Sequence, residues 1–135
     1  MDHAIDHAVI YDLVTTHPAA ILRFRHGEGG CISLGSRADL VAVRDVRGTP
    51  AQTLAQLSFV DIELVVLAGR VQVASAELDA RLPELHRLGL HALQIEGVTR
   101  YVRAPLPDLF RQVKQVLGED HLYLGNKEVR YFPTL

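Results

Sequence analysis

The sequence predicts a small α+β domain, on the basis of its composition and of three hairpin patterns. Of its 135 residues, 48% are hydrophobic and 22% are charged, which is normal for a folded globular chain. Three pairs of short apolar segments flank turns that contain glycine, as β-hairpins do. Segments with helical spacing of apolar residues lie around them. We therefore expect a small mixed β-sheet or partial β-sandwich built from hairpins, with flanking short helices.

The N-terminal part is expected to be helical. Apolar residues recur at helical spacing from Ile5 to Val14, and Pro18 interrupts the pattern. Pro18 suits the first turn of a second short helix over residues 18–23. A loop rich in glycine follows, with Gly27, Gly29 and Gly30.

The centre is expected to consist mainly of strands. A short apolar run follows Gly35, and two further runs flank Gly69 and Arg70 as a tight hairpin. The polar connection before that hairpin is expected to hold a helical turn at 52–56. The strands are expected at 38–43, 62–67 and 71–73.

The last third is expected to add two helices and two hairpins. Ser75 is a candidate N-cap for a helix over 76–87 that Gly89 ends, and Gly118 ends a helix over 107–117. The hairpin strands are expected at 91–95, 98–102, 122–124 and 128–132. The apolar residues of the second helix that are expected to face the core are Leu109, Phe110, Val113, Val116 and Leu117.

Charge and cysteine content narrow the function classes. The net charge of −2 gives no basic excess of the kind that nucleic-acid binding needs, so no nucleic-acid partner is expected. The longest apolar run, residues 64–68, is too short to cross a bilayer, and no membrane partner is expected. Cys31 alone cannot form an intramolecular disulfide. We expect a single domain over residues 1–135 in the cytoplasm, without a signal peptide.

The N-terminal residues are consistent with a metal site, and also with a solvated helix face. His3 and His7 are four residues apart on an expected helix, which is a spacing used to bind zinc, and Asp2 and Asp6 lie beside them. The glutamate of the zinc protease motif is absent, because Ala4 follows His3. A solvated helix face explains the same residues.

Other candidate residues also have structural explanations. The loop with Gly27, Gly29 and Gly30 lacks the Gly-Lys-Ser/Thr of a phosphate-binding loop, so a structural loop is expected. Cys31 is a nucleophile only if a histidine lies beside it; its neighbours favour a small buried residue. His86 and His91 flank a helix end, where a histidine favours the helix dipole. A solvated basic face or a weak anion site is expected from Arg100, Arg103, Arg111 and Lys114.

An ordered set of motifs covers residues 14–74. It contains a Thr-x-x-Pro-Ala segment, a Gly-x-Ile-x-x-Gly turn, an Ala-Asp-Leu strand and a Gly-Arg hairpin. In this order the segments resemble the C-terminal, non-barrel region of metal-dependent amidohydrolases of the dihydroorotase, hydantoinase and imidazolonepropionase kind. The residues that carry the resemblance are Thr15, Pro18, Ala19, Gly30, Gly35, Ala38, Asp39, Leu40, Gly69 and Arg70.

The motif residues have physical roles that we expect to be structural. Gly35 allows a turn conformation that branched residues resist. The carboxylate of Asp39 is placed to accept backbone N–H bonds from a turn. Leu40, with the valines that follow it, is expected to supply core, and Gly69 permits the hairpin. Residues 1–75 are thus the amidohydrolase-like region, and residues 76–135 are expected to be a family-specific α+β extension.

The resemblance implies a domain that is non-catalytic by itself. In such enzymes a preceding (β/α)8 barrel holds the divalent metal, and a barrel needs about 200 residues or more. We therefore expect no catalytic, cofactor-binding or metal-binding residue in this chain. The metal, zinc or a similar ion, is expected only in the absent barrel. The implied partners are a second copy of the chain or a barrel-containing chain that completes a split amidohydrolase. A small-ligand or anion-binding module is the remaining alternative.

Overall fold

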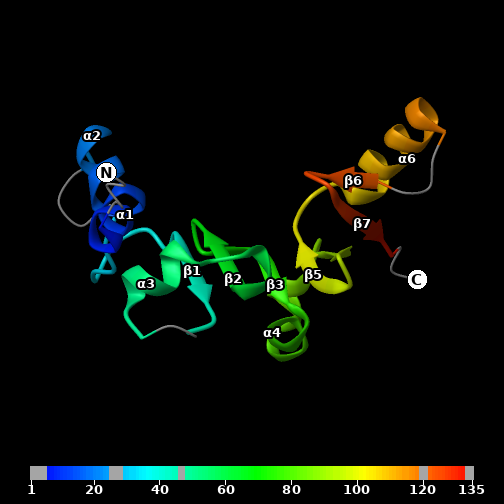
Figure 1. Cartoon of the computed structure of the whole chain (residues 1–135). Helices are drawn as coiled ribbons and strands as arrows, with labels where there is room; N and C mark the ends of the chain where they lie inside the picture. Colours follow the sequence, from blue (N-terminus) through cyan, green and yellow to red (C-terminus); the bar gives the residue numbers. More distant parts are fainter. Residues whose placement is uncertain (1–5, 25–28, 46–47, 119–121, 133–135) are drawn as a thin grey trace, which may run out of the picture.

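The computed structural model describes residues 6–24, 29–45, 48–118 and 122–132 (Figure 1). Across these residues the fold is α+β, with six α-helices beside a seven-stranded antiparallel sheet, as the sequence predicts. The helices are α1 (His7–Val14), α2 (Thr16–Ile21), α3 (Pro50–Ala55), α4 (Ala76–Arg81), α5 (Glu84–Arg87) and α6 (Leu106–Leu117). The strands are β1 (Leu40–Val43), β2 (Ile62–Leu67), β3 (Arg70–Ser75), β4 (His91–Ile95), β5 (Val98–Val102), β6 (Leu122–Leu124) and β7 (Lys127–Tyr131).

The sheet has the strand order β1-β2-β3-β5-β4-β7-β6, and every pairing is antiparallel. The three expected hairpins are β2–β3, β4–β5 and β6–β7. Each turns through two residues with positive φ, which matches the twist of the flanking strands. The turns are Ala68-Gly69, Glu96-Gly97 and Gly125-Asn126. Because β3 pairs with β5, both expected regions of the chain contribute strands to one sheet.

The sheet contains two β-bulges, in the β1–β2 and β2–β3 pairs. Between β1 and β2 the register shifts so that Glu63 has no residue opposite it. Between β2 and β3 a second shift leaves Gln72 without an opposing residue. A bulge bends its strand and redirects the side chain of the extra residue.

Two expected helices differ from the structure for reasons that involve proline. The second helix begins at Thr16, two residues before Pro18, because the first turn of a helix leaves N–H groups unpaired and tolerates proline. The helix expected over 76–87 is wrong as one element. Pro83 splits it into α4 and α5, and Leu82 before it is extended, with ψ 141°. The Ser75 cap is confirmed: its side chain accepts a hydrogen bond from the Leu78 N–H at 3.3 Å.

Helix α6 lies at the expected place, but its apolar face is only partly covered. Gly118 ends it at φ 69°, as expected. Phe110 packs on Tyr131 of β7, with ring centroids 5.3 Å apart. Leu109, Val116 and Leu117 are exposed, so the prediction that they face the core is wrong. The reason is the position of α6 at the end of the sheet, where the helix extends beyond β7 (Figure 1).

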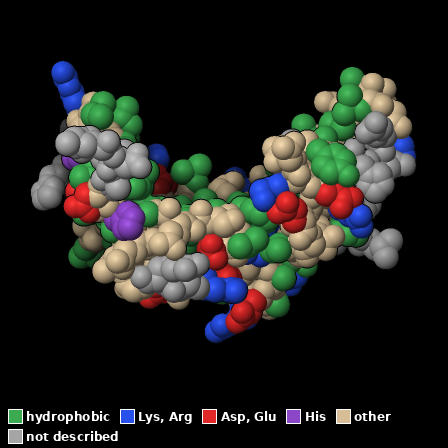
Figure 2. All heavy atoms as spheres, in the orientation of Figure 1, with side chains coloured by type: hydrophobic (Ala, Val, Ile, Leu, Met, Phe, Trp, Pro, Cys, Tyr) green, Lys and Arg blue, Asp and Glu red, His purple; other side chains and the backbone are tan. Residues whose placement is uncertain are grey.

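The buried apolar core is small for a chain of this mass. The buried hydrophobic residues among those described are Val71, Ala74, Leu106 and Val129. The chain exposes 10034 Å², whereas a compact protein of 14.9 kDa exposes about 7,000 Å². Figure 2 shows hydrophobic side chains on the surface of both raised ends, with a hollow between them. Among the described helices, none has the length and apolar character that a bilayer span requires.

Candidate functional site

The first group of motif residues meets where the loop around Gly30 lies against the start of α2. A side chain on Gly30 would place its Cβ 2.6 Å from the Thr15 carbonyl oxygen and 3.1 Å from the Ala19 Cβ. Gly30 also has φ +76°, a conformation that favours glycine. Pro18 lies between Thr15 and Ala19 in the same helical segment and is half-buried. The Thr-x-x-Pro-Ala segment and Gly30 therefore form one contact.

The second group meets where β1 begins beside the β2–β3 turn. The Asp39 Oδ1 accepts a hydrogen bond from the Ala68 N–H at 2.6 Å. The Gly69 N–H donates to the Ala38 carbonyl at 3.0 Å. The carboxylate of Asp39 thus accepts a turn N–H, as expected, and the donor belongs to a turn that lies 29 residues along the chain.

The electrostatics of Asp39 follow from this position. The Arg37 Nε donates to the Asp39 Oδ2 at 2.7 Å. This hydrogen bond, followed by the one from Ala68, holds the pKa of Asp39 below its usual value. The carboxylate is exposed, so its contribution is to hold two chain segments together and not to create a reactive group.

The remaining motif residues are Gly35, Leu40 and Arg70. Gly35 has φ +85° and no atom within 4 Å of its would-be Cβ, so only the backbone conformation needs glycine there. Leu40 is 41% exposed and Val41 is 61% exposed, so the expectation that they supply core is wrong. The reason is that β1 is an edge strand. Arg70 is exposed at the start of β3, and its carbonyl accepts from the Gln72 Nε2 at 3.4 Å.

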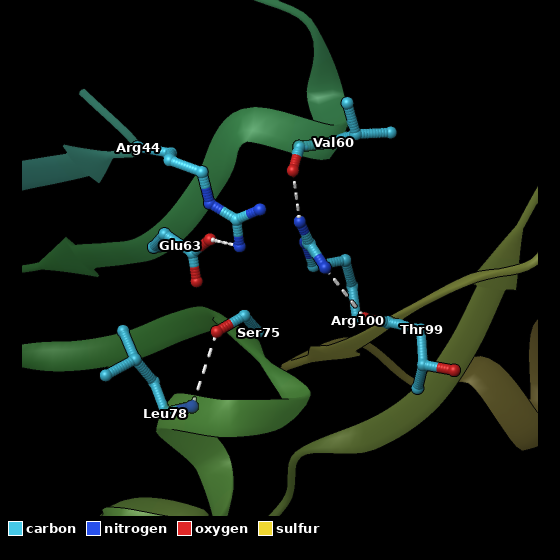
Figure 3. Close-up of polar contacts among 7 residues, drawn as sticks. All are labelled: Arg44, Val60, Glu63, Ser75, Leu78, Thr99 and Arg100. Atoms are coloured by element: carbon cyan, nitrogen blue, oxygen red, sulfur yellow. Dashed lines mark hydrogen bonds and ion pairs between the residues drawn. The ribbon is translucent and has the colours of Figure 1, made fainter. Parts of the chain in front are cut away.

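A polar cluster that the sequence analysis missed lies across β2, β3 and β5 (Figure 3). The bulge directs Glu63 toward Arg44, whose Nη2 lies 2.6 Å from the Glu63 Oε1. Arg100 is 8% exposed, and its Nη2 donates to the Val60 carbonyl at 2.7 Å. Ser75 is 4% exposed and lies opposite Arg100 in the register of β3 and β5. The sequence shows that Glu63 and Arg100 are charged residues within expected strands. It does not show that their side chains lie on the same face of one sheet.

The cluster favours the ionised form of Glu63. A hydrogen bond from Ser75, then the hydrogen bond and charge of Arg44 and the charge of Arg100, hold the pKa of Glu63 below its usual value, against the effect of burial. The arrangement links three strands, and the segment that follows β1, through their side chains. It neutralises buried charge and leaves the Glu63 carboxylate a weak base.

The lowered pKa values of Asp39 and Glu63 predict acid-sensitive stability. A carboxyl with a lower pKa in the folded state stabilises the fold above its unfolded pKa, and this stabilisation is lost as the pH falls toward the folded value. We expect the urea midpoint to fall as the pH drops below about 4.5, the usual value for glutamate. Urea unfolding at several pH values between neutral and acid measures this. Glu63→Gln is expected to flatten the dependence, and an unchanged dependence would contradict the role of Glu63.

The arginines expected to form a basic patch are used in internal contacts. Arg103 donates from Nε to the Val71 carbonyl at 2.7 Å, from Nη2 to the His86 carbonyl at 3.0 Å, and from Nη1 to the Leu88 carbonyl. Arg111 forms an ion pair with Asp108 at 3.1 Å on α6. Arg100 is buried, as described above. The expectation of one solvated basic face is therefore wrong for Arg100 and Arg103, whereas Arg111 and Lys114 are exposed on α6.

The histidines do not form a cluster in the part of the chain that the structure describes. His7 is exposed in the first turn of α1. His86 is exposed in the last turn of α5, where the expected interaction with the helix dipole is available. His91 lies on β4 and makes a T-shaped contact with the Tyr131 ring, at 6.3 Å between centroids. His3 lies outside the described residues.

The expectations for Cys31 and the glycine loop have different outcomes. Cys31 is exposed, so the prediction of a buried residue is wrong; it lies outside every helix and strand, and no element covers it. Gly29 and Gly30 lead into bends and not into a helix, which does not fit a phosphate loop. Gly27 is outside the described residues. Within those residues, no group of three or more His, Cys, Asp or Glu side chains fits a metal ion.

Comparison of the chain with protein-family models, with curated proteins and with solved structures gave no significant match.

Proposed function

We propose that this chain is a non-catalytic domain of the amidohydrolase type. The supporting observation is that motif residues distant in sequence meet in two contacts that depend on residue type. Gly30 lies where any side chain would collide with the Thr15 carbonyl oxygen. Asp39 binds the Ala68 N–H of the β2–β3 turn. For this region, the resemblance implies an ordered set of motifs that stabilises one sheet and the helix beside it.

The proposed role is to pack beside a catalytic barrel, in the same polypeptide or as a separate subunit of a split enzyme. In the resembled family the barrel supplies a divalent metal that activates water against a carbon–nitrogen bond. In this proposal the metal and the water that it activates belong to the barrel, and this chain supplies none of their ligands. Exposed apolar residues of the N-terminal helices, such as Ile21 at 79%, support a surface that contacts other protein. We place the protein in the cytoplasm, whose reducing conditions suit the exposed Cys31.

The proposal is tested by assaying the purified chain for metal-dependent hydrolysis. Hydantoin, dihydroorotate and a lactam are incubated with the protein in the presence of zinc or manganese, and product is measured. We expect product formation no faster than in a protein-free control containing the same metal. Turnover that requires the protein and that a chelator abolishes would contradict a non-catalytic domain.

A capture experiment tests the positive part of the same proposal. The tagged chain is incubated with extract of its source cells, and bound proteins are identified by mass spectrometry. A split enzyme predicts stoichiometric recovery of a barrel-containing amidohydrolase subunit. The same capture is repeated with the variant Ile21→Asp, which places a charge on the exposed surface of α2. This variant is expected to recover less of the barrel subunit.

A further inference from the structure

A pocket lies between the start of β3 and the last turn of α5. Its volume is about 320 Å³, at the small end of the roughly 300–1,000 Å³ that ligand-binding pockets span. α5 packs against β3, and the side chain of Arg103, which follows β5, contacts both. Beside Gly69 at the β2–β3 turn, the lining consists of three basic and three apolar residues: Arg70, His86, Arg103, Val71, Leu85 and Leu88.

Arg103 fixes the shape of this pocket and places a positive charge at it. Its guanidinium donates to the carbonyls of Val71 at 2.7 Å, of His86 at 3.0 Å, and of Leu88. These three bonds join β3 to the end of α5. The acceptors are neutral, and no carboxylate of the described residues pairs with Arg103. Because a guanidinium has five N–H groups, the charge is held in place with hydrogen-bonding capacity left over.

Arg70 and His86 supply donors that the described residues do not occupy. The side chain of Arg70 is exposed and has no hydrogen-bond or ion-pair partner among those residues. His86 is also exposed, and an imidazole can donate a hydrogen bond in either protonation state. By contrast, Arg87 beside it pairs with Asp79 at 3.1 Å. None of the described lining residues is Asp or Glu, so the electrostatics of the pocket favour an anion.

The other lining groups favour an organic anion with a single charge. Leu85 is 75% exposed and Leu88 is 59% exposed, so both offer apolar surface that a ligand can cover. α5 ends at the pocket with carbonyl groups and not with the N–H groups that commonly bind phosphate, which disfavours a doubly charged ligand. A planar carboxylate matches the two parallel N–H groups that an arginine presents.

We propose that this pocket binds a small carboxylate with an apolar body, such as an aromatic acid. The carboxylate binds Arg70 and the His86 imidazole beside the fixed charge of Arg103. The apolar body covers Leu85 and Leu88. The site is formed by β3, α5 and the end of β5, and it is independent of whether the chain is related to amidohydrolases.

The first test is an NMR titration of the isotope-labelled full chain with benzoate. We expect millimolar benzoate to shift the backbone amide signals of Arg70 and of residues 85–88, and the Nε–H signal of Arg103. Benzamide has the same ring without the charge and is expected to leave these signals in place. Inorganic phosphate is expected to bind more weakly than benzoate. Absence of shifts at these residues, equal shifts with benzamide, or tighter binding of phosphate would each overturn the proposal.

The second test compares variants of two exposed arginines. Arg70→Gln is expected to weaken benzoate binding about tenfold, because it removes a charge-assisted hydrogen bond. The control is Arg81→Gln on α4, which is exposed and does not line the pocket, and it is expected to leave the affinity unchanged. Unshifted signals elsewhere in the spectrum show that each variant is folded. Wild-type affinity in Arg70→Gln, or an equal loss in Arg81→Gln, would contradict the assigned site.

A third variant tests the apolar part of the site. Leu85→Ala is expected to weaken benzoate binding severalfold, because it removes apolar surface that the ring covers. The same variant is expected to bind acetate as the wild type does, since acetate has no ring to place on Leu85. If Leu85→Ala bound benzoate with unchanged affinity, the ligand class with an apolar body would be wrong.

Discussion

Replacing Arg100 with methionine is expected to lower the free energy of unfolding by about 2–4 kcal/mol, since it breaks a buried ion and hydrogen-bond network. Methionine keeps much of the side-chain length but cannot donate. The Val60 carbonyl then loses the hydrogen bond that Arg100 donates at 2.7 Å, and Glu63 loses a positive neighbour. The measurement is urea unfolding at neutral pH, followed by circular dichroism.

The matched control for this change is Arg44→Met. Arg44 pairs with Glu63 at 2.6 Å, but its side chain is 60% exposed, whereas the residue Arg100 is buried. Exposed ion pairs contribute little, so the control is expected to cost less than about 1 kcal/mol. Equal losses for the two variants would show that burial of Arg100 is not what makes the cluster important.

Replacing Gly30 with alanine is expected to destabilise the N-terminal helices by about 2–4 kcal/mol, because steric and backbone effects add. The new Cβ would lie 2.6 Å from the Thr15 carbonyl oxygen and 3.0 Å from the Thr16 Cα, both backbone atoms that a rotamer change cannot move. The backbone also has φ +76°, which alanine adopts at a cost. Urea unfolding measures the loss, and helical circular dichroism shows whether α1 and α2 are affected.

Gly35→Ala separates the two causes. Gly35 has a similar φ of +85°, but no atom lies within 4 Å of the would-be Cβ. The control is therefore expected to cost only the conformational part, about 1 kcal/mol. If Gly30→Ala costs no more than Gly35→Ala, the contact between the loop and α2 does not stabilise the fold.

The parts of the candidate site differ in how far the sequence could predict them. The turn N–H bond of Asp39 could be anticipated, because an aspartate before a strand commonly accepts one. Its donor could not, since Ala68 lies 29 residues away. The cluster of Glu63 and Arg100 escaped prediction for a related reason. A bulge sets the direction of Glu63, and the β3–β5 pairing brings Arg100 beside it.

The sequence by itself determined the elements whose causes are local. The three hairpin turns, the Ser75 cap and the Gly118 end of α6 depend on the conformational preferences of a few adjacent residues. Periodicity over one segment then distinguishes helix from strand. These features need no knowledge of distant residues, and the α+β class follows from them.

Only the tertiary structure decided which of these surfaces are covered. The stripe of α6 has the pattern of a core face, yet Val116 is 81% exposed because the helix reaches past the last strands. β1 has the composition of a buried strand, yet Val41 is exposed because β1 ends the sheet. Burial depends on the order of strands and on where helices dock, which are set by contacts between residues far apart in the chain. A periodic pattern shows which face is apolar, but not what lies against it.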